Sequence, residues 1–260
     1  MCGFTGTLSF EDIDNTKLKK SNEHSICRGP DNLSNVIGSE DINYDLWFNR
    51  LSIVDLSDKA NQPMLSENSN SIVMFNGEIY NSKILREKIS KTKYNFKSTH
   101  SDTETLFAGL ETYGIDFIND LEGQFSFFYL DKRKKKIYFT RDRVGQKPLY
   151  ISMSKKSISF ASNLKSILEL NGKYKLDPKS LSQYIAYGAI FSPKTLFNDI
   201  YKVKPANYIE VDYSKGEFEN TELEYWNTES YLDNKRFVYE EFQNLLSESV
   251  EKRMIADVPI

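Results

Sequence analysis

Four short runs of aromatic and β-branched residues follow one another in the middle of the chain, each separated from the next by a polar, turn-forming cluster. They cover residues 125–130, 137–141, 149–153 and 158–161. Runs of this length and composition predict strands, and such short connections join antiparallel neighbours, since a parallel pair needs a longer crossover. The spacing therefore predicts a meander of antiparallel strands and argues against a doubly wound parallel sheet.

The first half of the chain adds further strands. Residues 2–10 alternate apolar with small or polar side chains, which predicts a half-buried strand beside the N-terminus. Residues 44–50 and 71–76 also predict strands by their β-branched and aromatic content. Each of these runs is followed by a polar cluster, where we expect the strand to end.

Two helices are predicted among these strands. Residues 18–26 read as a short helix that ends before Gly29 and Pro30. Ser101 and Asp102 are good helix N-cap types, and the apolar residues that follow at helical spacing are Leu106, Phe107, Leu110 and Tyr113. Strands, then helices, then more strands predict an α+β architecture in which helices pack on the faces of antiparallel sheets.

The composition of the sequence changes after about residue 201. Residues 207–225 are polar with one or two marginal strands, and regularly spaced apolar side chains between residues 238 and 254 mark one face of a long helix. We therefore expect one domain over residues 1–205. Residues 206–260 are expected to be a linker and the first helix of a second domain, which is truncated and offers this helix little to pack against.

Charge and composition limit the kinds of partner. Lys+Arg number 34 and Asp+Glu 37, so the formal net charge of -3 gives no electrostatic reason to expect nucleic acid or an anionic membrane. Apolar residues make up 39% of the chain, enough for a substantial core. The sequence therefore predicts an ordinary globular protein whose ligands are small molecules.

Cysteine and histidine are too scarce for a disulfide framework or a zinc cluster. The chain has two Cys and two His, which indicates a reducing compartment and predicts no metal site. No basic leader precedes a signal-like apolar run, and no apolar stretch approaches the roughly 20 residues that span a bilayer. We therefore expect a cytoplasmic protein.

A cysteine in second position has a particular chemistry available to it. Aminopeptidases remove Met1 when the next side chain is small, which would leave Cys2 with both a thiol and a free α-amine. The reference pKa values are about 8.5 for the thiol and roughly 7.7–8.0 for the amine, so the amine is suited to take the thiol proton near neutral pH. On position alone, Cys2 is more often a small apolar residue, so other residues must decide.

Six sequence blocks decide between a catalytic Cys2 and a small apolar one. They are residues 1–3, 28–31, 50–55, 76–81, 101–104 and 141–150. In this order they resemble the N-terminal part of glutamine-hydrolysing asparagine synthetases, which carry a class II glutamine amidotransferase (glutaminase) domain of the N-terminal-nucleophile (Ntn) type. The resemblance implies the four-layer αββα fold of Ntn hydrolases, two antiparallel sheets flanked by helices, followed by the start of a truncated α/β synthetase domain.

The resemblance implies the reacting groups. Cys2 is the implied nucleophile, which attacks the side-chain carbonyl of L-glutamine to form a thioester while its α-amine passes the thiol proton to the departing ammonia. The side-chain amide of Asn76 and the backbone N–H of Gly77 are the implied oxyanion hole. Glycine suits the second position because it permits close backbone approach.

The resemblance also implies the groups that bind glutamine. Arg50 is implied as the bidentate clamp on the substrate α-carboxylate, a geometry that lysine cannot reproduce. Glu78 and Asp102 are implied to receive the α-ammonium, which would be costly to bury unpaired. The remaining implied contacts come from Leu51, Ser52, Ile53, Val54, Asn76 and Gly77.

Each of these residues has a plainer reading when it is taken alone. Arg50 would be a surface charge at the end of a strand, Asn76 and Gly77 a hairpin turn, and Asp102 a helix N-cap. Cys27 stands where the family usually has histidine, and we expect it to be a small buried residue. The six blocks together favour the catalytic reading over these alternatives.

The resemblance places the second substrate outside this chain. Residues 253–260 resemble the segment just before the family's pyrophosphate loop, which is absent here. ATP and Mg²⁺ are therefore expected for the missing synthetase half, and no cofactor for glutamine hydrolysis. The implied ammonia acceptor is aspartate or a related compound. The implied partner is a synthetase domain, in the same chain or in a separate one, and either arrangement is compatible with a homodimer. The alternative is a catalytically silent module that binds glutamine or regulates a partner.

Overall fold

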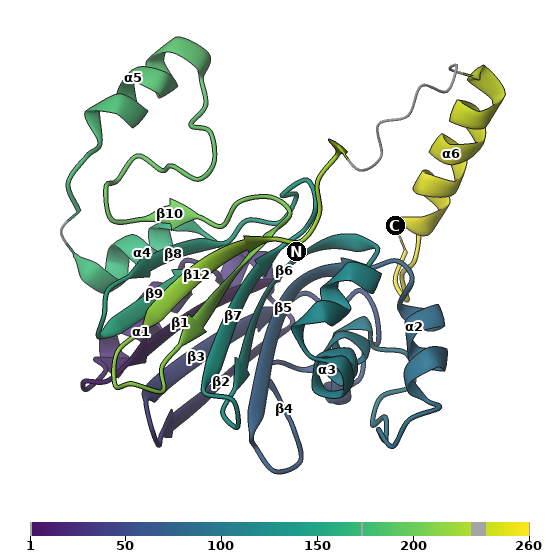
Figure 1. Cartoon of the computed structure of the whole chain (residues 1–260), viewed down its shortest axis with the longest axis horizontal. Coiled ribbons are helices and arrows are strands. Elements are labelled where there is room, and N and C mark those ends of the chain that lie inside the picture. Colours follow the sequence, from purple (N-terminus) through teal and green to yellow (C-terminus); the bar gives the residue numbers. More distant parts are fainter. Residues whose placement is uncertain (1, 173, 230–237, 260) are drawn as a thin grey trace.

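The computed structural model describes residues 2–172, 174–229 and 238–259. Its strands form two six-stranded antiparallel sheets. In the first sheet the strand order is β10-β8-β9-β1-β3-β2, and in the second it is β12-β11-β7-β6-β5-β4. The expectation of antiparallel sheets with helices on their faces is confirmed (Figure 1).

The strands of the first sheet come from both ends of the first 202 residues. They are β1 (Gly3–Ser9), β2 (Asn32–Ser39), β3 (Asn43–Arg50), β8 (Tyr150–Met153), β9 (Ser157–Ala161) and β10 (Tyr201–Lys202). The strands of the second sheet are β4 (Met64–Leu65), β5 (Ser71–Ile79), β6 (Gly123–Asp131), β7 (Lys136–Arg141), β11 (Asn207–Asp212) and β12 (Glu219–Glu224). The predicted N-terminal strand is confirmed as β1, which lies between β3 and β9.

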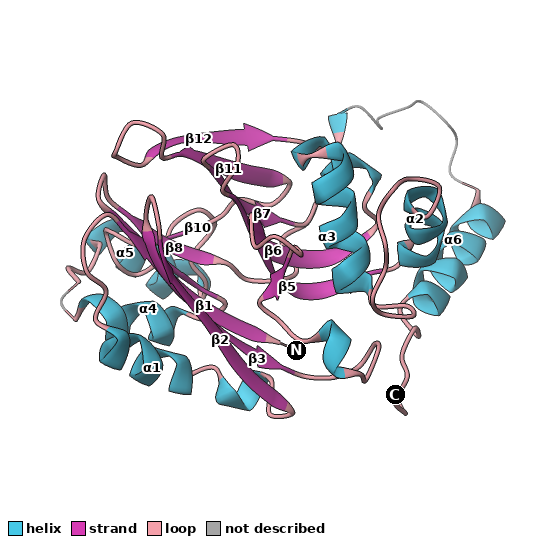
Figure 2. Cartoon of the chain, turned by 90° about the horizontal axis from the view of Figure 1, so that it is seen from below, coloured by secondary structure: helices cyan, strands magenta, loops and turns pink. Residues whose placement is uncertain are grey.

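Four helices cover the outer faces of the two sheets, and two stand away from them. The first four are α1 (Asn15–Glu23), α2 (Ser82–Ile89), α3 (Asp102–Tyr113) and α4 (Leu164–Asn171), and the other two are α5 (Pro178–Tyr187) and α6 (Tyr239–Lys252). The pair α1 and α4 lies on the first sheet, and α2 and α3 lie on the second (Figure 2). The predicted four-layer αββα arrangement is therefore present.

Alternation along β5 shows how the layers are held together. Ile72 and Met74 enter the core between the two sheets, whereas Val73 and Phe75 enter the core between the second sheet and its helices. Successive strand residues point to opposite faces, so a strand buried on both faces has a continuous apolar run. The two cores together bury most of the phenylalanine side chains of the chain, with Phe4, Phe128, Phe139 and Phe160 among those between the sheets.

The predicted single meander is wrong. The hairpin β6–β7 belongs to the second sheet and the hairpin β8–β9 to the first, so residues 142–149 carry the chain from one sheet to the other. The Asp142 carboxylate accepts the backbone N–H groups of Gln146 and Lys147 at 2.9 and 3.0 Å. The Arg141 guanidinium donates to the carbonyls of Lys147 and Val203 at 2.9 and 2.8 Å. These buried bonds fix a connection that leaves the plane of the second sheet.

Two other elements differ from the expectation. The first helix begins earlier, at Asn15, because the Asp14 side chain accepts the Lys17 N–H as an N-cap. It ends at Glu23, and a separate 3₁₀ turn, Ile26–Arg28, follows. Cys27 in this turn is exposed, so its expected burial is wrong.

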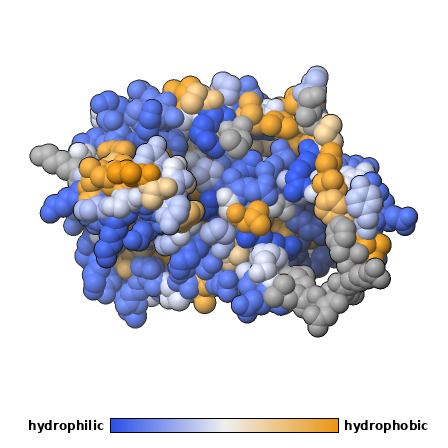
Figure 3. Space-filling view, turned by 90° about the horizontal axis from the view of Figure 1, so that it is seen from above, coloured by the Kyte–Doolittle hydropathy of each residue, from blue (hydrophilic) through white to orange (hydrophobic). Residues whose placement is uncertain are grey.

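The last two strands complete the second sheet. Residues of β11 pair with β7, and β12 pairs with β11. The expected boundary between residues 205 and 206 therefore lies before two strands of this sheet. Beyond them, α6 has no buried residue and exposes Phe242, Leu245 and Leu246, and exposed apolar side chains also gather on α5 (Figure 3).

Candidate active site

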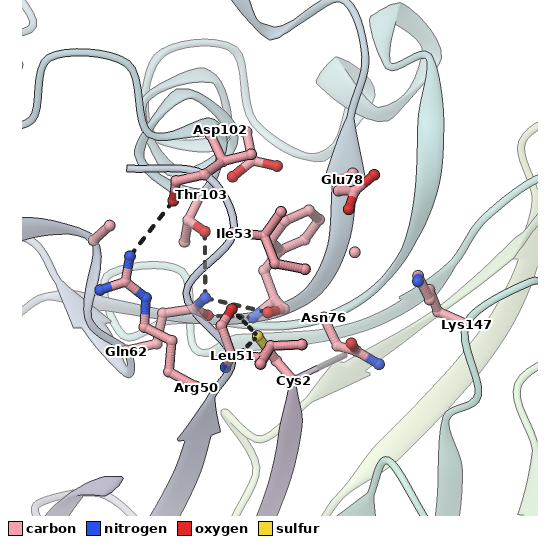
Figure 4. A pocket seen from close by; sticks show the side chains of 14 residues that line it. Cys2, Arg50, Leu51, Ile53, Gln62, Asn76, Glu78, Asp102, Thr103 and Lys147 are labelled. Carbon is pink, nitrogen blue, oxygen red and sulfur yellow. Dashed lines mark hydrogen bonds between the residues drawn. The ribbon is translucent and has the colours of Figure 1, made fainter. Parts of the chain in front are cut away.

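One pocket opens where β1, β3 and β5 converge with the start of α3 (Figure 4). Its walls include nine of the ten residues that the sequence singled out. They are Cys2, Arg50, Leu51, Ile53, Val54, Asn76, Gly77, Glu78 and Asp102. Ser52 is not on the wall, and its backbone N–H donates instead to the Asp31 carboxylate at 2.7 Å.

The Cys2 thiol lies at the base of this pocket, immediately before β1. Its Sγ accepts from the Leu51 N–H at 3.4 Å and lies 3.6 Å from the Leu51 carbonyl oxygen. Burial raises the pKa of the thiol, while the Leu51 N–H and the Arg50 charge oppose this shift. A thiol in this setting needs a nearby base to become a nucleophile near neutral pH. The Cys2 carbonyl is fixed by a 3.1 Å bond from the Arg28 Nε.

Asn76 and Gly77 lie within β5 and not in a hairpin turn, so the turn reading is wrong. They pair with Ser126 and Phe125 of β6. The Asn76 side chain is buried, and its Nδ2 has no hydrogen-bond partner among the residues that the structure describes. A buried donor left unpaired costs about 1–3 kcal/mol. Such a donor in a pocket wall is suited to a ligand oxygen.

The absence of a side chain at Gly77 is required by the neighbouring strand. A Cβ at this position would lie 2.1 Å from the Gln124 carbonyl oxygen and 2.7 Å from the Phe125 Cα. Both atoms belong to the backbone of β6, which has no room to move away within a central sheet. Gly77 therefore allows β5 to stay paired with β6 along the pocket wall, and it adds no side chain to that wall.

Two carboxylates face the pocket from different elements. Asp102 is the first residue of α3, and its Oδ2 accepts the Ile79 N–H at 3.2 Å. The helix cap is Ser101, whose side chain accepts the Glu104 N–H, so Asp102 is free of the predicted capping role. Burial raises the pKa of Asp102 to about 6, opposed by the Ile79 N–H and supported by the charge of Glu78. A cation bound between these carboxylates would relieve their repulsion.

Arg50 lies in the pocket wall and already makes several hydrogen bonds. Its Nη1 donates to the Ser57 carbonyl at 2.8 Å and to Asn61 Oδ1 at 2.7 Å. Its Nη2 donates to the carbonyls of Val54 and Asp55. The guanidinium therefore holds the loop after β3, a role that sequence reasoning did not assign to it.

Sequence reasoning missed several residues of the wall, of which Gln62, Thr103 and Lys147 are polar. Lys147 is buried, and burial lowers the pKa of its amine, against the charges of Glu78 and Cys2. It stands in the 141–150 block, to which the resemblance assigns no catalytic or binding residue. Gln62 fixes β5 by accepting the Phe75 N–H at 2.6 Å, and it donates to Thr103 Oγ1 at 3.2 Å. No local sequence signal marks Gln62.

Across residues 2–172, 174–229 and 238–259, no group of three or more His, Cys, Asp or Glu side chains is arranged to hold a metal ion. Within the same ranges, every helix is too short or too polar to cross a bilayer.

The two antiparallel sheets flanked by helices form the fold of the Ntn-hydrolase class. The fold is similar to that of the glutamine phosphoribosylpyrophosphate amidotransferase of B. subtilis, with a TM-score of 0.55, 16% identity, and coverage of 85% of this chain and 49% of the other. Residues 1–226 match the model of the glutamine amidotransferase domain, and the chain belongs to this family.

Curated relatives extend the similarity to the whole chain. Glutamine-hydrolyzing asparagine synthetase 1 of Bacillus subtilis is 30% identical over 274 residues, covering 100% of this chain and 41% of that protein. Glutamine-hydrolyzing asparagine synthetase 2 of the same organism is 31% identical over 280 residues, covering 100% of this chain and 36% of that protein. The chain thus spans less than half of the length of these two relatives.

Proposed function

We propose that this chain hydrolyses L-glutamine to glutamate and ammonia, with Cys2 as the N-terminal nucleophile after removal of Met1. The Cys2 sulfur attacks the side-chain carbonyl carbon of glutamine, and its α-amine takes the thiol proton. The C–N bond breaks as that proton passes to the leaving nitrogen, which departs as ammonia. Water then attacks the resulting thioester, which releases glutamate and restores the thiol. No cofactor enters this sequence.

The pocket supplies a group for each charge that this reaction develops or buries. The Asn76 side-chain amide and the Gly77 N–H stabilise the oxyanion of each tetrahedral intermediate. Glu78 and Asp102 pair with the substrate α-ammonium. Arg50 receives the α-carboxylate, together with main-chain groups of the loop that it holds.

The observation that carries the proposal is the unpartnered, buried Asn76 Nδ2 in the same pocket as the Cys2 thiol. A silent glutamine-binding module could use this donor for the substrate oxygen, but it has no need of a thiol nucleophile beside the donor. A merely structural Asn76 would be expected to satisfy its own amide.

The fate of the ammonia belongs to the second half of the proposal. The curated relatives are more than twice as long as this chain and are named asparagine synthetases. We propose that a synthetase portion, in the same or a separate polypeptide, uses the ammonia with ATP, Mg²⁺ and aspartate or a related acceptor. The reaction would take place in the cytoplasm, and a homodimer is compatible with it.

Covalent labelling separates this proposal from a silent glutamine-binding module. The intact mass of the purified chain is measured before and after 6-diazo-5-oxo-norleucine, a glutamine mimic that alkylates a competent nucleophile. Loss of Met1 and one adduct, absent from Cys2→Ala, are expected. The exposed Cys27 is present in both proteins and so serves as an internal control. Retained Met1, or an adduct that persists in Cys2→Ala, would overturn the assignment.

A further inference from the structure

The segment after α6 returns to the wall of the pocket. The Asp257 backbone N–H donates to the Ile53 carbonyl at 2.8 Å. Its side-chain Oδ2 accepts the Asp55 backbone N–H at 2.7 Å. Two hydrogen bonds therefore join Asp257 to the loop that carries Ile53 and Val54 of the pocket wall, over a separation of about 200 residues.

This loop is held from one side by Arg50 and from the other by Asp257. Arg50 binds the carbonyls of Val54, Asp55 and Ser57, whereas the contacts of Asp257 are with the Asp55 N–H and the Ile53 carbonyl. Asp55 has φ 53, in the left-handed region that a non-glycine residue rarely adopts. A backbone in this conformation persists where surrounding bonds fix it, so both sets of contacts are needed to hold the loop.

The Asp257 carboxylate is itself oriented by a histidine. His100 Nε2 lies 2.5 Å from the same Oδ2 that accepts the Asp55 N–H, and His100 Nδ1 lies 2.6 Å from Thr99 Oγ1. The hydrogen bond from His100 lowers the pKa of Asp257, against a smaller effect of burial. His100 precedes the N-cap of α3, whose first residue is Asp102 in the pocket.

We propose that Asp257, oriented by His100, is a positioning residue that sets the conformation of the glutamine-binding loop at residues 51–57. The inference rests on the proposed function for its substrate. It means that the segment after α6 controls the conformation of the pocket wall. When this segment is displaced, the Asp55 N–H and the Ile53 carbonyl lose their partners and the loop relaxes. Glutamine binding then weakens while the thiol and the oxyanion hole stay in place.

The same segment offers a matched control. Lys252, in the last turn of α6, forms an ion pair with Glu122 at 2.9 Å. This pair also ties the C-terminal segment to the domain formed by the two sheets, but neither residue lines the pocket. Lys252→Ala therefore removes a tether of the segment without removing a partner of the loop.

The test measures glutamine hydrolysis and amide hydrogen exchange on the full chain. Asp257→Ala is expected to raise the KM for glutamine roughly tenfold, the scale of a lost hydrogen bond to a charged group, with kcat changed less than twofold. Asp257→Asn retains an oxygen for both donors and is expected to restore most of the wild-type KM. Exchange should accelerate in a peptide over residues 51–57 of Asp257→Ala and stay unchanged in Lys252→Ala.

Histidine variants complete the test. His100→Ala should resemble Asp257→Ala, and the double variant should be no worse than either, because the pair acts as a unit. His100→Gln, which keeps a side-chain N–H donor, should lie between His100→Ala and the wild type. An unchanged KM and unchanged exchange in Asp257→Ala would overturn the inference. An inactive wild type would overturn the proposed function instead, and exchange of residues 51–57 would still decide this inference.

Discussion

Replacing Asp45 by asparagine is expected to stabilise the protein at neutral pH much more than in acid. The Asp45 side chain is 0% exposed, on the face of β3 turned away from the core between the sheets. Neither carboxylate oxygen has a hydrogen-bond partner in the described part of the chain. Burial raises the pKa from 3.8 to about 6, and the nearby side-chain N–H groups of Trp47 and Asn35, which do not reach hydrogen-bond geometry, lower it by less.

The magnitude follows from these two pKa values. Below pH 3.8 the carboxyl is neutral in the folded and the unfolded chain, and it carries no penalty. Between pH 3.8 and about 6 only the unfolded chain releases the proton, so the free energy of unfolding falls as the pH rises. At 1.36 kcal/mol for each pH unit, the loss is complete above pH 6 and amounts to about 3 kcal/mol.

Urea denaturation, followed by tryptophan fluorescence, measures this effect. The gain of Asp45→Asn over the wild type should be about 2 kcal/mol larger near pH 8 than near pH 4.5, since part of the penalty remains at the lower pH. Any fixed cost of burying the amide cancels between the two conditions. Asp12→Asn removes an exposed carboxylate and should change little at either pH. An equal gain for Asp45→Asn at both pH values would refute the reasoning.

Three further predictions concern the pocket. Asn76→Ala should lower kcat roughly 100- to 1000-fold with little change in the KM for glutamine, and a loss confined to KM would remove Asn76 from the oxyanion hole. Arg50→Lys should raise the KM for glutamine more than it lowers kcat, because lysine lacks the fork of donors that binds the substrate carboxylate and the loop carbonyls. An unchanged KM in steady-state assays would contradict this. The KM should also rise as the pH falls through about 6, because the Asp102 carboxylate takes up a proton there and no longer pairs with the substrate ammonium. If the pH profile of KM is the same in Asp102→Asn, another group is responsible for the titration.

The elements of the fold were largely predictable, but the way in which they assemble was not. Periodicity located β1, β3 and α3, since burial on one face leaves a local pattern. The assignment of β8 and β9 to the other sheet depends on buried bonds of Arg141 and Asp142, for which a row of short strands carries no signal. Similarly, β5 was expected to end at Asn76 because Asn and Gly are poor strand residues, whereas its pairing with β6 continues to Ile79.

The candidate site was predictable where a motif names the residue. Resemblance identified Cys2, Asn76 and Asp102, which come from separate parts of the chain and share one pocket. It did not identify the contact of Asp257 with His100 at 2.5 Å, because 157 residues separate them and neither stands in a recognisable pattern with the other. Contacts of this kind arise from tertiary packing alone.

The central place of β1 has a consequence for synthesis on the ribosome. Its partner β3 ends at Arg50, but its other partner, β9, ends at Ala161, and the Phe4 carbonyl accepts the Ser162 N–H. At about 5–20 residues per second, on the order of 10 s separates the emergence of these two neighbours. Throughout this interval the edge of β1 that pairs with β9 is open. The proposed removal of Met1 would therefore have this interval before the first sheet closes beside Cys2.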